Sequence, residues 1–107
     1  MKDIKESRKA PRIRLGCRLF FSGENFLEGE ATILDLSKTG CAAESETPVE
    51  VGKQLELTIF LPDFDWQLRV DGAVVRWVRG QTFGLEFVSL RPVHRERLRR
   101  LVDKFKD

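Results

Sequence analysis

The sequence predicts a mainly β fold: a six-stranded antiparallel β-barrel followed by one C-terminal α-helix. Short apolar runs alternate with polar residues at the two-residue period of half-buried strands. Turn-forming residues separate these runs, and the C-terminal residues change to a helical period. Six short strands joined by turns favour a closed barrel, because closure removes the exposed strand edges.

Three strands are expected in the first half of the chain. Residues 13–22 and 27–36 are rich in apolar and β-forming residues, and the sequence SGEN at 22–25 predicts a hairpin turn between them. A third strand is expected over 39–43, and the Pro- and Gly-containing region 48–52 ends it.

Three further strands follow. Apolar residues alternate over 55–61, and the turn residues of 62–65 end this fourth strand. The apolar residues from Leu68 to Trp77 keep to one face of a fifth strand only if the phase slips once at Gly72, where a β-bulge is predicted. Alternation over 83–87 predicts the sixth strand.

A helix is expected over 93–106, with Pro92 suited to its start. Glu96 and Arg100 form an i, i+4 pair in the favourable orientation. His94 lies at the start of this basic helix, where a solvated or capping role is expected. The cationic surface of the helix is a candidate contact for an acidic partner. Its apolar face comprises Leu98, Leu101, Val102 and Phe105.

Length and composition predict one soluble domain over residues 1–107. The chain has 41% hydrophobic and 34% charged residues, and its length suffices for one core. No apolar run approaches the roughly 20 residues of a membrane span, and the N-terminus has no apolar signal core. A cytoplasmic location is therefore expected, with Cys17 and Cys41 as reduced, buried thiols.

Charge is unevenly distributed although the net charge is only +2. Residues 1–18 hold seven Lys/Arg against two acids, residues 19–68 hold two against ten, and residues 69–107 hold ten against five. The acidic middle argues against a long nucleic-acid track and fits a compact anion bound near the basic N-terminus. A small nucleic-acid-binding barrel remains an alternative.

No catalytic or metal-binding site is predicted. The chain has a single histidine, no Gly-rich phosphate loop, no nucleophile motif and no cluster of metal ligands. The expected protein is a sensor that performs no reaction and carries no cofactor.

Two short motifs point to a guanine-nucleotide ligand. The sequence RKAPR places Arg8 and Arg12 four residues apart, and DLSKTG supplies Asp35, Ser37 and Gly40. Guanidinium groups suit phosphate oxygens and the acceptor edge of guanine, whereas a carboxylate suits the N–H donors of guanine.

The two motifs resemble the signature of the PilZ domain, the bacterial receptor module for cyclic di-GMP: R-x-x-x-R followed by [D/N]-x-S-x-x-G. The stretches GAVVRWVRG at 72–80 and TFGLEFVSL at 82–90 are similar to the paired late strands of that family. The resemblance implies a flexible basic arm at 1–12 that carries the arginines, a barrel at 13–90 and a helical segment at 91–107.

The resemblance also implies roles for the second motif. Asp35 would accept hydrogen bonds from guanine N1–H and N2–H₂, and Ser37 would bond a phosphate or a guanine group. Gly40 would supply a positive φ angle or room for the ligand. The alternative is that the three residues only form a tight turn.

Three neighbouring positions are candidate peripheral residues. In this family a further arginine just before the first motif arginine goes with a stacked pair of ligand molecules, so Ser7 at that position favours a single molecule. Lys9 and Lys38 would add electrostatic attraction, although exposed lysines contribute little individually.

The resemblance implies a cyclic di-GMP receptor or adaptor. Ligand binding would draw the N-terminal arm onto the barrel and change the surface presented to an effector protein in trans, in control of motility, biofilm formation or virulence. A ligand-independent adaptor in pilus or flagellar function is the first alternative, ahead of the nucleic-acid-binding barrel. Whether the chain is a monomer or a dimer is left open.

Overall fold

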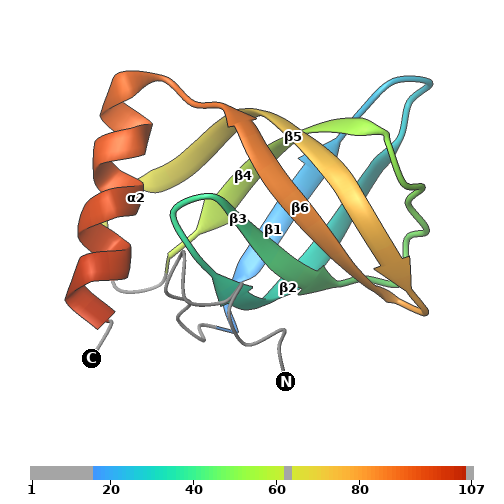
Figure 1. The fold of residues 1–107 in the computed structure, drawn as a ribbon, viewed down its shortest axis with the longest axis horizontal. Helices are drawn as coiled ribbons and strands as arrows, with labels where there is room; N and C mark the ends of the chain where they lie inside the picture. The colour runs from blue at the N-terminus through green and yellow to red at the C-terminus, as the bar shows by residue number, and fades with distance from the viewer. Residues whose placement is uncertain (1–15, 62–63, 106–107) are drawn as a thin grey trace, which may run out of the picture.

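The computed structural model describes residues 16–61 and 64–105, and it contains six strands and one helix in this part of the chain. Figure 1 shows the order of these elements along the chain. They are β1 (Arg18–Ser22), β2 (Glu28–Leu36), β3 (Gly40–Glu44), β4 (Gln54–Phe60), β5 (Gln67–Arg79), β6 (Thr82–Ser89) and α2 (Pro92–Phe105).

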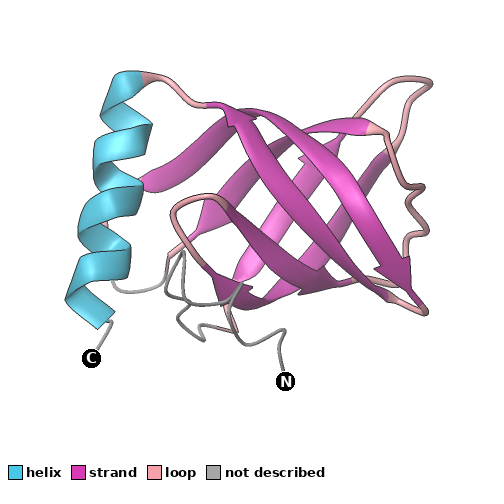
Figure 2. Cartoon of the chain, viewed as in Figure 1, coloured by secondary structure: helices cyan, strands magenta, loops and turns pink. Residues whose placement is uncertain are grey.

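The strands form a closed barrel in the order β1-β2-β3-β6-β5-β4, and every neighbouring pair is antiparallel. The predicted mainly β fold with a C-terminal helix is confirmed (Figure 2). The β1–β2, β3–β4 and β5–β6 connections lie at one end of the barrel, whereas α2 and the β2–β3 turn lie towards the other end (Figure 1). No helix in the described residues is long and apolar enough to cross a membrane.

The barrel interior is filled by the alternating apolar residues of the strands. Leu57 and Ile59 of β4 are almost fully buried, and so is Phe21 of β1. The ring of Phe21 meets that of Phe83 on β6 edge to face, with ring centroids 5.9 Å apart. Cys41 is buried against the same core as an unpaired thiol, as is Cys17, in agreement with the sequence prediction.

The strand boundaries differ from expectation at β1. The sequence predicted a strand from residue 13, whereas β1 begins at Arg18. Gly16 has a φ of 65°, a left-handed value that does not continue a strand, and residues 13–15 lie outside the described part. The predicted bulge in β5 is confirmed by the pairing with β4, in which Leu57 pairs with Val70 and Leu55 with Ala73, so that β5 has one extra residue at 71–72.

Helix α2 contributes Leu98, Leu101 and Val102 to the barrel core, as predicted from their helical spacing. The side chain of Phe105 lies outside the described part. On the outer face, hydrogen bonds from Arg99 and Arg100 lower the pKa of Glu96 to about 2. Two arginines of α2, Arg99 and Arg100, are thus paired with acidic residues of the same helix.

His94 joins the start of α2 to the barrel. Its Nδ1 accepts a hydrogen bond from the backbone N–H of Arg69 on β5, at 3.1 Å. Partial burial and the nearby arginines lower the pKa of His94, which keeps the imidazole neutral and able to accept this bond.

Candidate functional site

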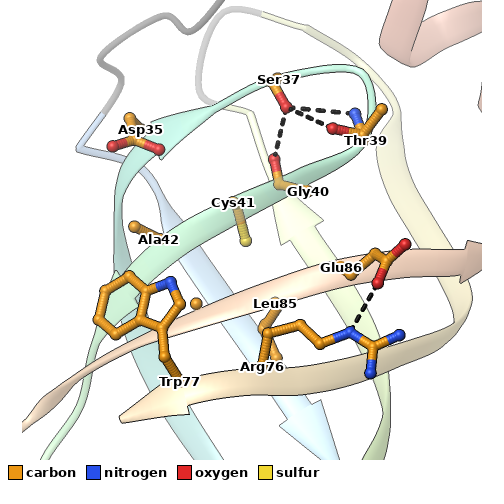
Figure 3. Close-up of a pocket in the computed structure, with 11 residues that line it drawn as sticks. Asp35, Ser37, Thr39, Gly40, Cys41, Ala42, Arg76, Trp77, Leu85 and Glu86 are labelled. Carbon is orange, nitrogen blue, oxygen red and sulfur yellow. Dashed lines mark hydrogen bonds and ion pairs between the residues drawn. The ribbon is translucent and has the colours of Figure 1, made fainter. Parts of the chain in front are cut away.

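The turn between β2 and β3 is formed by the second motif. The backbone N–H of Ser37 donates to the carbonyl of Gly40 at 2.9 Å. The Ser37 hydroxyl, which is buried, accepts from the Thr39 backbone N–H at 3.2 Å and donates to the Gly40 carbonyl at 3.3 Å. Ser37 therefore satisfies the polar backbone groups of its own turn (Figure 3).

Gly40 is required by the packing of the barrel. A Cβ atom at this position would lie 2.1 Å from the carbonyl oxygen of Leu85 on β6, far inside van der Waals contact. Gly40 was expected to supply either a positive φ angle or room for the ligand; it is not among the residues with a positive φ angle, so the first alternative is wrong. The room that Gly40 provides accommodates the neighbouring strand.

Asp35 owes its position to a bulge in β2. The pairing with β3 shifts register between Ile33 and Asp35, so that Ile33 and Leu36 are both buried while Asp35 faces outward beside Ala42. Bulges of this kind redirect side chains near functional sites. Asp35 thereby reaches the same pocket as Ser37.

The pocket has a volume of about 250 Å³ and lies on the outer face of the barrel. Its lining residues come from β2, the β2–β3 turn, β3, β5 and β6: Asp35, Ser37, Thr39, Gly40, Cys41, Ala42, Arg76, Trp77, Gly84, Leu85 and Glu86. Figure 3 shows Asp35 and Ser37 on one side, Arg76 and Trp77 on the other, and Cys41 and Ala42 between them.

Trp77 provides a flat apolar wall beside the pocket. A Cβ atom on Gly84 would lie 2.1 Å from Trp77 Nε1, so the indole occupies the space that a side chain at Gly84 would fill. The guanidinium of Arg79 lies 5.3 Å from the centre of the indole ring, within the range of a cation–π contact. An indole that is 37% exposed remains available for stacking.

The charged groups of the pocket are two carboxylates, Asp35 and Glu86, and one guanidinium, Arg76. Arg76 Nε and Glu86 Oε1 are 2.6 Å apart. The pKa of the Cys41 thiol is raised, mainly by burial and to a smaller extent by the negative charge of Asp35. Cys41 is therefore neutral and unsuited to act as a nucleophile. The pocket suits a planar group with hydrogen-bond donors and acceptors, but on its own it lacks the cations that phosphates need.

The structure thus brings together three of the predicted site residues, Asp35, Ser37 and Gly40. Arg8 and Arg12 lie outside the described residues, as do the peripheral candidates Ser7 and Lys9. The third peripheral residue faces elsewhere: Lys38 Nζ lies 3.3 Å from Asp103 Oδ1 on α2.

Among the pocket residues that sequence prediction missed, three have charged or aromatic side chains that suit a ligand: Arg76, Trp77 and Glu86. Regular alternation from Val75 placed Trp77 on the inward face, and that placement is wrong. A second register shift in β5, between Val75 and Trp77, turns the indole outward. Trp77 of β5 pairs with Gly84 of β6. Both residues can be read from the sequence, but their pairing depends on this register shift.

The family profile of the PilZ domain matches residues 5–104. The chain belongs to the PilZ domain family. No curated protein matches the sequence. The expected family and the expected barrel are therefore both confirmed.

Solved structures of PilZ proteins share the fold. The PilZ domain of YcgR from Escherichia coli, solved with c-di-GMP, matches with a TM-score of 0.71 and 16% identity over 92% of this chain and 90% of that one. The Bacillus subtilis inhibitor of motility MotI/DgrA has a TM-score of 0.73 and 19% identity over 91% of this chain. This chain spans 50% of the length of MotI/DgrA. At these identities the likeness establishes the fold alone.

Proposed function

We propose that this PilZ protein is a receptor for cyclic di-GMP that signals to a partner protein. The observation that carries the proposal is the pocket in which the carboxylate of Asp35, the guanidinium of Arg76 and the exposed indole of Trp77 surround a space open to solvent. This combination is suited to a guanine base, and YcgR, which has the same fold, was solved with c-di-GMP.

In the proposed complex one guanine stacks on Trp77, because an indole face that is only partly covered gains from contact with a planar base. Asp35 accepts hydrogen bonds from guanine N1–H and N2–H₂. Arg76 donates to O6 and N7 on the opposite edge of the base, at the expense of part of its contact with Glu86.

The phosphates require Arg8 and Arg12. With two carboxylates and one guanidinium, the described pocket does not attract a dianion. Two arginines of the N-terminal motif would reverse this balance, and their planar donor forks match phosphate oxygens. Drawing residues 1–12 onto the barrel would change the surface presented to an effector in trans, which is the proposed signal.

A ligand-independent adaptor is the second candidate, and a specific observation favours it. Ser37 and Gly40 have structural tasks in the turn and at β6 that do not need a ligand. The second motif is therefore compatible with a PilZ domain that binds no nucleotide.

The deciding experiment is calorimetric titration with cyclic di-GMP, with GTP and cyclic di-AMP as controls. We expect selective binding with a micromolar Kd, about −8 kcal/mol, and one ligand molecule per chain. An Arg8/Arg12 double alanine variant should lose binding and keep the same unfolding midpoint. Absence of binding to the folded wild-type protein would support the adaptor, and unchanged binding by the double variant would refute the site.

A further inference from the structure

The β1–β2 hairpin ends in an exposed aromatic side chain held by an unusual turn. Asn25 and Phe26 have φ angles of 60° and 62°, and the Leu27 N–H donates to the Glu24 carbonyl at 3.2 Å. Two consecutive left-handed residues spanned by this hydrogen bond form a type I′ turn, whose second central position strongly favours glycine. Here that position is occupied by Phe26, a bulky residue for which a positive φ angle is a genuine outlier.

Phe26 gains no packing in return for this strained backbone. Its relative exposure is 100%, the highest of the exposed large hydrophobic residues in the described part, where the next is Val51 at 61%. The base of the hairpin is well packed, because Leu27 lies against the core and Gly23 fits closely beside Leu55. The turn is thus firmly held while its aromatic ring contacts only solvent.

The surroundings of Phe26 are acidic. A groove of about 850 Å³ beside the ring is lined by Glu24, Glu28 and Glu50, with Lys53 as the one basic residue that lines it among those described. Within residues 16–61 and 64–105, none of the three glutamates forms an ion pair. Their charges therefore extend into solvent around an apolar centre.

We propose that this surface, the acidic tip formed by Glu24, Phe26, Glu28 and Glu50, is a docking site for a partner protein whose apolar pocket is bordered by lysine or arginine residues. A single aromatic anchor among charges that are mainly of one sign suits an interface hot spot, in which the ring supplies affinity and the charges supply orientation and association rate. Strained backbone that is retained without a packing gain is likewise typical of functional sites.

The acidic tip lies at the end of the barrel away from α2, whereas the nucleotide pocket involves the β2–β3 turn towards the α2 end (Figure 1). The proposed docking does not rest on ligand binding at Asp35. A partner held at the tip would leave the nucleotide pocket open.

The first test uses stability. Phe26→Gly creates the Asn-Gly pair that a type I′ turn prefers, so we expect the variant to unfold at a temperature about 3 °C higher than the wild type. Phe20→Ala is the matched control, because Phe20 is a partly exposed phenylalanine on the wall of the barrel. A lower unfolding temperature for Phe26→Gly would show that the ring supports the fold, which would overturn the proposal.

The second test uses a photo-crosslinking phenylalanine analogue placed at position 26, and at position 20 as control, in full-length protein expressed in its native cells. We expect one major adduct that is specific to position 26 and whose modified partner residues lie in an apolar pocket beside basic residues. Phe26→Gly should then weaken binding of the purified partner about thirtyfold, and added salt should weaken it further.

Three outcomes would overturn the proposal: no adduct above the position 20 control, an adduct only with a second copy of this chain, or a partner surface without basic residues. The experiment is repeated with and without cyclic di-GMP. An adduct that forms in both conditions supports the acidic tip even if calorimetry detects no nucleotide binding, so the two proposals fail separately.

Discussion

Replacing Gly84 with alanine tests how the wall of the nucleotide pocket is built. The added methyl group would lie 2.1 Å from Nε1 and 2.4 Å from Cε2 of Trp77, so the indole must leave its position. The neighbour that must move is a side chain, and we therefore expect the barrel itself to remain folded.

The size of the effect follows from the area that Trp77 loses. A fully buried tryptophan covers up to about 250 Å²; at 37% exposure, Trp77 covers about 150 Å². Losing half of that area costs about 2 kcal/mol at about 25 cal/mol per Å². Loss of the contact with Arg79, whose guanidinium lies 5.3 Å from the ring centre, adds about 0.5 kcal/mol.

Urea unfolding of Gly84→Ala, Trp77→Ala and the double variant measures this coupling directly. Gly84→Ala should destabilise the wild type by about 2.5 kcal/mol and have little effect when Trp77 is already alanine. With Trp66 replaced by phenylalanine, the emission of Trp77 alone should shift to longer wavelength in the Gly84→Ala protein. Equal destabilisation in both backgrounds would refute the reasoning, because the methyl group would then clash with something other than the indole.

Three further predictions concern the fold around the site. Gly40→Ala should destabilise the protein by about 3 kcal/mol in urea unfolding, because its methyl group would meet the backbone oxygen of Leu85, which cannot move away as a side chain can; a change below about 1 kcal/mol would contradict this. Leu98→Ala should cost about 3 kcal/mol by leaving a cavity between α2 and the barrel, with the exposed control Val93→Ala near neutral. His94 has a lowered folded-state pKa, so the unfolded chain binds the proton more tightly: wild-type stability should be complete above the unfolded value of 6.5 and fall as pH decreases towards the folded pKa. His94→Ala should remove this pH dependence. If the stability of the wild type and of His94→Ala changed equally with pH, the hydrogen bond from Arg69 would contribute nothing.

The elements with a regular period could be predicted from the sequence. The alternation of β4 and the helical spacing of Leu98 and Leu101 are direct consequences of burial on one face, and the phase slip at Gly72 revealed the first bulge of β5, which lies in its pairing with β4. The second bulge of β5 could not be found, because Val75 and Trp77 are both apolar and fit an unbroken alternation. Its position depends on pairing with β6, which is a property of the closed barrel.

The site was predictable only where its residues are neighbours in sequence. Asp35 and Ser37 form one short motif, so their common location followed from chain proximity. Arg76 and Glu86 come from different strands and meet through the β5–β6 register, which no local pattern specifies. The sequence prediction also treated Gly40 as a ligand residue. In the structure, a side chain at this position is excluded by the backbone carbonyl of Leu85 on the neighbouring strand β6.

The close approach of Gly40 to Leu85 has a consequence for comparing members of this family. Selection for a barrel that folds is enough to preserve Ser37 and Gly40, even in a family member that no longer binds a nucleotide. The presence of Ser37 and Gly40 in a sequence therefore does not by itself distinguish a nucleotide receptor from a ligand-independent adaptor.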